Sequence, residues 1–200
     1  MPSPYLRLAA IVVSLLACCE TFASPAPTVS SADVLEAIRS FEGNLPSNLA
    51  LSGKSAKDST AQLAKAANTI VDFAINSDSV VIDMGPDSVT WCDVKKGVNG
   101  MAHSGERGLL FGAYLSGSIK AQLTSGKTDP NPYAGWIAAL RLYKTLKARD
   151  NVQIAELDLL AAKQQDATLE SYAAEAAKRS VARLEANYHG QRPVTLALAH

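Results

Sequence analysis

The sequence predicts a mainly α-helical protein, an irregular bundle of about six helices with one small β-hairpin. Apolar residues recur at helical spacing through most of residues 31–190. Two short β-branched runs lie within residues 79–94, and Gly or Pro residues separate the periodic segments. A chain of 200 residues is long enough for one well-buried core, so we expect a single helical domain over residues 31–190.

The first segment, residues 1–23, has the form of a secretory signal peptide. Arg7 precedes an apolar run over residues 8–19, which is too short to span a bilayer as a helix. Thr21-Phe22-Ala23 then places small residues at the first and third positions before a cut ahead of Ser24. We therefore expect an exported protein, periplasmic or extracellular, with residues 24–30 as a linker.

A second processing route is left open by the same segment. Leu15-Leu16-Ala17-Cys18 resembles the bacterial lipobox, and the resemblance implies that Cys18 becomes a lipidated first residue and anchors the protein to a membrane. Cleavage before Ser24 instead leaves Cys92 as the single cysteine of the mature chain, so no internal disulfide can form.

Two helices are predicted at the start of the domain. Ser30 and Asp33 form a capping-box pattern before a helix that ends at Gly43. A second amphipathic helix follows a polar loop and runs to about Asn76.

A hairpin is predicted next, from strands at residues 79–84 and 89–94 joined by the turn Gly85-Pro86-Asp87-Ser88. An isolated hairpin is marginal in water, so its buried side must pack against helices. That side would consist of Val80, Ile82, Met84, Val89 and Trp91.

The remaining chain is predicted to be helical. One helix runs from Ser104 to a stop at Gly126, with small residues every fourth position that let another helix approach closely: Gly108, Gly112 and Ser116. Asn131-Pro132 is typical of the start of the next helix. These paired helices resemble helical-repeat proteins such as tetratricopeptide-repeat proteins, although no period of about 34 residues is present.

Residues 152–188 contain neither Gly nor Pro, which predicts a long helical stretch. The apolar pattern loses its phase around Gln164-Gln165-Asp166, so we expect a bend or a break there. Residues 191–200 are a tail whose apolar part is either an edge strand or a frayed end.

Charge and motifs exclude several functions. With 19 basic and 19 acidic residues the formal net charge is zero, which argues against nucleic-acid binding. No phosphate-binding loop, zinc-protease or serine-hydrolase motif is present, and the three histidines have no metal-ligand spacing. We therefore expect no cofactor, no metal and no membrane span.

Residues 83–107 are the densest run of chemically useful side chains. Cys92 and His103 are candidates for a nucleophile and its base, with Asp83 or Glu106 orienting the imidazole, as in a small cysteine-dependent hydrolase or acyl-transfer enzyme. A single cysteine beside a tryptophan is also the usual pattern of a small buried apolar side chain.

The function that the sequence favours is protein–protein interaction, as an adaptor, an envelope-associated factor or an inhibitor-like protein. Trp91, Arg107 and Tyr114 are the candidate binding residues, because aromatic and arginine side chains supply much of the binding energy at protein interfaces. The partner would be another protein, and the oligomeric state is left open.

Overall fold

The computed structural model describes residues 29–45, 54–92 and 101–190. Within these ranges it contains no strand and six helices: α2 (Ser31–Gly43), α3 (Lys54–Asn76), α4 (Ser104–Ser125), α5 (Tyr133–Asp150), α6 (Ala155–Gln165) and α7 (Leu169–Gly190). The predicted helical bundle is confirmed. The predicted signal peptide with Cys18, most of the linker and the tail lie outside the described residues.

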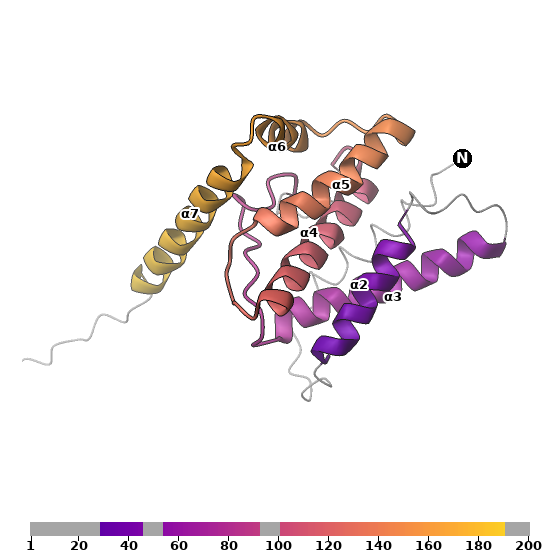
Figure 1. Ribbon diagram of the computed structural model, residues 1–200, viewed down its shortest axis with the longest axis horizontal. Helices are drawn as coiled ribbons and strands as arrows, with labels where there is room; N and C mark the ends of the chain where they lie inside the picture. The colour runs from indigo at the N-terminus through magenta and orange to yellow at the C-terminus, as the bar shows by residue number, and fades with distance from the viewer. Residues whose placement is uncertain (1–28, 46–53, 93–100, 191–200) are drawn as a thin grey trace, which may run out of the picture.

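The helix pair α4 and α5 forms the centre of the molecule (Figure 1). Helices α2 and α3 pack against each other and against α4 on one side, while α6 and α7 pack against α5 on the other. Among the described helices, none is long and apolar enough to cross a membrane.

The predicted helix boundaries are largely confirmed. The hydroxyl of Ser30 accepts a hydrogen bond from the Asp33 amide at 3.2 Å, and the Asp33 carboxylate accepts one from the Ser30 amide at 3.3 Å, which is the expected capping box. Helix α4 ends at Gly126 in the left-handed conformation, φ +67°. Helix α5 begins at Tyr133, whose amide donates to the Asn131 side chain at 3.0 Å.

The long stretch after Val152 is broken as expected. Helix α6 ends at Gln165 and α7 begins at Leu169, with Ala167 between them at φ +55°. A non-glycine residue in this region ends a helix because the following residues cannot continue its hydrogen-bonding pattern.

Two glycines of α4 allow neighbouring helices to approach closely; Gly112 belongs to the predicted stripe of small residues, and Gly117 does not. A Cβ atom added at Gly112 would lie 2.8 Å from the ring of Phe41 in α2. One added at Gly117 would lie 2.6 Å from the carbonyl oxygen of Ala134 in α5. Two neighbouring helices therefore rest on positions of α4 that have no side chain.

The predicted hairpin is wrong. Residues 85–92 form turns instead of a second strand: the Ser88 amide donates to the Gly85 carbonyl at 3.0 Å, and the Cys92 amide donates to the Val89 carbonyl at 2.8 Å. Residues 93–94 lie outside the described residues. The predicted buried side is nevertheless correct, because five apolar side chains of this run are buried in or packed against the core: Val80, Ile82, Met84, Val89 and Trp91.

Candidate functional site

We call residues 77–92 the connecting segment. It begins directly after α3 and ends at the last described residue before residues 93–100. It lies between α4 and α5 on one side and α7 on the other (Figure 1). It carries Asp83, Trp91 and Cys92, while His103 precedes α4 and the other candidates are in α4.

Side chains of α4 replace the missing strand partner at the beginning of the connecting segment. The amide group of Gln122 accepts a hydrogen bond from the Val81 N–H at 2.9 Å and donates one to the Val81 carbonyl at 2.8 Å. The Tyr114 hydroxyl donates to the Asp83 carbonyl at 2.5 Å. These bonds satisfy backbone groups that a hairpin would have paired, which is the physical reason why no hairpin is needed.

Two further side chains hold the second half of the connecting segment. The indole N–H of Trp136, in α5, donates to the Ser88 carbonyl at 2.6 Å. Arg107, in α4, donates through Nη1 to the Trp91 carbonyl at 2.5 Å. The path of the segment is therefore fixed by bonds from two helices.

Arg107 is a buried cation with three partners. It is 8% exposed, and its Nε also donates to the Ala102 carbonyl at 2.9 Å. Its Nη2 lies 3.6 Å from the Glu156 carboxylate at the start of α6. Arg107 thus joins α4, α6 and the connecting segment, and its charge is balanced by a carboxylate that is partly exposed to solvent.

Trp91 and Tyr114 are also interior residues. Their rings meet edge to face with centroids 5.9 Å apart, and both side chains are almost fully buried. Burial, and then the negative charge of Asp83, raise the pKa of Tyr114, so its hydroxyl stays a hydrogen-bond donor. The binding role of Trp91, Arg107 and Tyr114 stays a prediction. In this structure Arg107 and Tyr114 bond the backbone of the connecting segment, and the Trp91 ring buries one end of the segment in the core.

Asp83 organises the turn that follows it. One carboxylate oxygen accepts the Gly85 amide at 2.8 Å and the other accepts the Ser88 hydroxyl. These bonds close the turn at residues 85–88, as expected of an aspartate before a tight turn.

Cys92 is partly buried, and its environment disfavours ionisation. Burial raises the pKa of its thiol from 9.0 to about 12, a shift that the nearby Arg107 cation opposes and the Glu156 carboxylate reinforces. The thiol is therefore protonated at neutral pH. This state is the opposite of an activated nucleophile, whose pKa is lowered.

The structure does not join Cys92 to the rest of the predicted catalytic group. Among the described residues no hydrogen bond connects Cys92 with His103. His103 is exposed, with a left-handed backbone at φ +57°, and its side chain does not cap α4. Glu106 lies in the first turn of α4, where a carboxylate is favourable to the helix dipole. The catalytic role of these residues and Asp83 stays a prediction.

Helix α7 is attached to the same region. The Asp87 carboxylate lies 3.0 Å from Arg183 and 3.4 Å from Arg179. Nearer the N-terminal end of α7, the ring of Tyr172 stacks on Trp136 with centroids 5.5 Å apart.

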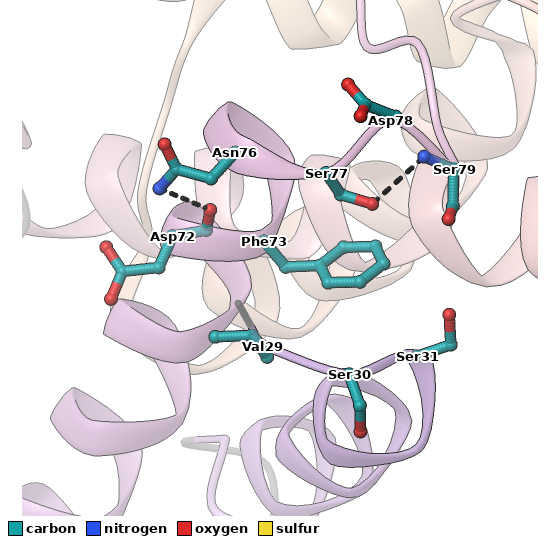
Figure 2. Close-up of a pocket in the computed structure, with 9 residues that line it drawn as sticks. All are labelled: Val29, Ser30, Ser31, Asp72, Phe73, Asn76, Ser77, Asp78 and Ser79. Atoms are coloured by element: carbon teal, nitrogen blue, oxygen red, sulfur yellow. Dashed lines mark hydrogen bonds between the residues drawn. The ribbon is translucent and has the colours of Figure 1, made fainter. Parts of the chain in front are cut away.

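A pocket of about 300 Å³ lies where α2 begins and α3 ends (Figure 2). Phe73 lies at its centre, with the hydroxyls of Ser30 and Ser31 on one side and those of Ser77 and Ser79 on the other. The Ser30 hydroxyl is occupied by Asp33, and the Ser77 hydroxyl accepts the Ser79 amide at 3.1 Å. Two carboxylates, those of Asp72 and Asp78, also line the pocket.

Metal ligands do not converge anywhere in the described ranges. No three His, Cys, Asp or Glu side chains there are placed so that they could hold an ion.

Three residues that were not among the predicted site residues also make contacts in this region: Gln122, Trp136 and Glu156. Gln122 is 41 residues from the backbone that it binds. No local sequence pattern predicts such a contact, because a glutamine in a helix normally faces solvent.

The chain matches no protein-family model, no curated protein and no solved structure.

Proposed function

We propose that this chain is an exported helical protein that acts by binding another protein, without a cofactor, in an adaptor, envelope-associated or inhibitor-like role. The export part of the proposal rests on residues 1–23, with a lipid anchor at Cys18 as its alternative form.

One observation carries the binding part. Three buried side chains form hydrogen bonds with the backbone of the non-helical connecting segment and fix its path: Gln122, Arg107 and Trp136. Binding residues often lie on loops that a rigid scaffold positions, and the connecting segment is such a loop. Val81, 48% exposed, is a large apolar side chain that it leaves in solvent.

The cysteine-enzyme alternative receives no comparable support. Its nucleophile is protonated, and its base is neither hydrogen-bonded to it nor buried beside it. The proposal therefore assigns no chemistry to Cys92 and His103.

Site-specific photocrosslinking in the cells that make the protein tests the proposal. A photoreactive residue would replace each exposed large apolar side chain in turn: Ile75, Val81, Leu159 and Val181. We expect a discrete protein adduct from at least one position and none from the control position Arg39, an exposed residue of α2. If no position yields an adduct, the binding role is wrong.

A further inference from the structure

The corner between α6 and α7 has an unusual residue at its turning point. The Thr168 amide donates to the Lys163 carbonyl at 2.9 Å and the Ala167 amide to the Gln164 carbonyl at 3.3 Å, so α6 ends in a Schellman motif. The left-handed position of this motif is usually a glycine, because a Cβ atom disfavours that backbone. Here it is Ala167, at φ +55°. The corner therefore has a conformational cost that a straight helix would not have.

The sequence of this region also favours a straight helix. Residues 155–189 contain neither Gly nor Pro, and most of them are residue types that form helices readily. Asp166 and Thr168, on either side of Ala167, are weaker helix formers that a helix interior tolerates. If residues 166–168 were helical, α6 and α7 would be one helix about 54 Å long, at about 1.5 Å per residue. Such a helix would carry α7 away from the body of its own chain.

Helix α7 lies at the edge of the molecule and contacts the rest of its chain along one face (Figure 1). The ring of Tyr172 stacks on Trp136 in α5, and further along α7 two arginines pair with Asp87 of the connecting segment, Arg183 at 3.0 Å and Arg179 at 3.4 Å. Three apolar side chains of the same helix are buried: Leu169, Ala173 and Ala176. We call the surface around Trp136 and Asp87 the α7 seat. Each of its contacts joins α7 to another element, so α7 of a second copy of the chain can make the same contacts.

We propose that two copies of this chain form a dimer by exchanging α7, so that α7 of each copy occupies the α7 seat of the other. Residues 166–168 become helical in this dimer, and α6 continues into α7. The contacts of Tyr172 with Trp136 and of Asp87 with the two arginines are kept, and only the chain that supplies α7 changes. Exchange of one element between identical chains is a low-cost route to a dimer, and here it relieves the left-handed Ala167 in both copies. Association entropy opposes the exchange, so the dimer fraction rises with concentration.

Substitutions at the corner test the exchange. Ala167→Gly removes the Cβ that the left-handed backbone disfavours and weakens a continuous helix, so it should raise the dissociation constant of the dimer by at least about tenfold. Thr168→Ala replaces a weak helix former and removes a side chain that bonds the Lys163 carbonyl at 3.4 Å in the closed corner, so it should lower that constant. Ala162→Gly is the matched control, because residue 162 is helical in both forms, and it should leave the constant nearly unchanged. Sedimentation equilibrium of the purified chain measures all three.

Complementary charge reversals at the α7 seat test which chain supplies α7. One variant carries Asp87→Arg, and the other carries Arg179→Glu together with Arg183→Glu. Each variant alone has like charges at its seat, whether α7 comes from its own chain or from an identical copy. In a mixed dimer with exchanged α7, opposite charges meet at both seats. We expect native mass spectrometry of an equimolar mixture, incubated until its composition stops changing, to show the mixed dimer in about tenfold excess over the self-paired dimers.

Three results would overturn the inference: a chain that sediments as a monomer at every concentration, a dimer that Ala167→Gly and Ala162→Gly affect equally, or a mixture of the charge variants without a preference for mixed dimers. Either of the last two would mean that the copies associate through another surface. The proposed binding role does not depend on this dimer, because photocrosslinking to a different protein tests that role separately.

Discussion

Arg107 illustrates how single residues are used in the interior of this protein. Its guanidinium has two carbonyl partners, in Trp91 and Ala102, and a carboxylate partner in Glu156. We expect Arg107→Met to lower the free energy of unfolding by about 3 kcal/mol, because the two carbonyls and the carboxylate would lose their shared hydrogen-bonding partner. Urea denaturation measures the loss.

Arg39→Met is the matched control for that substitution. Arg39 is exposed and pairs with Glu36 on the same helix, so its loss should change stability by less than about 0.5 kcal/mol. Equal effects of the two substitutions would mean that the bonds of Arg107 do not hold the connecting segment.

The pH dependence of Cys92 alkylation tests its chemistry. With a pKa of about 12, the thiolate fraction should rise about tenfold per pH unit between pH 7 and 10 without levelling, and iodoacetamide should react at a rate that follows it. Urea-unfolded protein should instead level off near the ordinary pKa of 9.0. A plateau near neutral pH in the folded protein would support the catalytic hypothesis for Cys92 and His103.

The raised pKa of Cys92 also makes the stability of the folded protein depend on pH. The unfolded chain ionises Cys92 at lower pH than the folded chain does, so stability is lost as pH rises from 9.0 toward 12. The raised pKa of Tyr114 acts in the same direction at higher pH.

Sequence reasoning at this scale singled out several residues of this region but did not predict their contacts. Asp83, Arg107 and Tyr114 stood out because polar and aromatic residues are dense there, yet the structure uses them to bond backbone. A residue type shows which bonds a side chain can make, but the choice of partner depends on tertiary placement.

Among the elements, the contact between α4 and α5 depends on glycine. Gly117→Ala should lower stability by about 1–3 kcal/mol although alanine favours helix, because its Cβ would lie 2.6 Å from both the Ala134 carbonyl and the Ala138 Cβ. Gly43→Ala is the control, since nothing lies within 4 Å of a Cβ there, and it should leave stability unchanged or raise it. Thermal denaturation followed by circular dichroism measures both. Equal effects would contradict the close approach.

Trp136 connects three elements at once. It is fully buried in α5, donates to Ser88 in the connecting segment and stacks on Tyr172 in α7. We expect Trp136→Ala to cost about 3–5 kcal/mol of stability, and Trp136→Phe to cost less because an aromatic ring remains. A loss under about 1 kcal/mol for alanine in chemical denaturation would place Trp136 at the surface.

The helices were predictable from the sequence because their start and stop signals are local. The hairpin prediction failed because strand pairing depends on residues elsewhere in the chain. The capping pair Ser30 and Asp33 and the stop at Gly126 lie within a few residues of the helix ends that they define. The run at residues 80–84 was predicted to be a strand, but its backbone bonds to the side chains of Gln122 and Tyr114 in another element. The apolar pattern of the sequence predicts which side chains are buried. The partners of the backbone N–H and C=O groups depend on the tertiary fold.

For the molecule as a whole, the order of the helices was predictable and their packing was not. Helix α7 illustrates the difference, because Val181 is 42% exposed while Leu169, Ala173 and Ala176 are buried. Alanine-rich helices carry more than one weakly apolar face, so the side that is buried is selected by what is available to pack against it.

The N-terminus of the mature protein depends on which of the two processing routes cleaves the signal peptide. Expression in a bacterial host should yield an exported product whose intact mass starts at Ser24 and carries no lipid, since small residues precede that cut and the apolar run is short. Ala23→Arg should block the cut and leave precursor, whereas Cys18→Ser should change nothing. A product that starts at a lipid-modified Cys18, partitions with membranes and is lost in Cys18→Ser would establish the anchored form instead, and the partner of the connecting segment would then have to be within reach of that membrane.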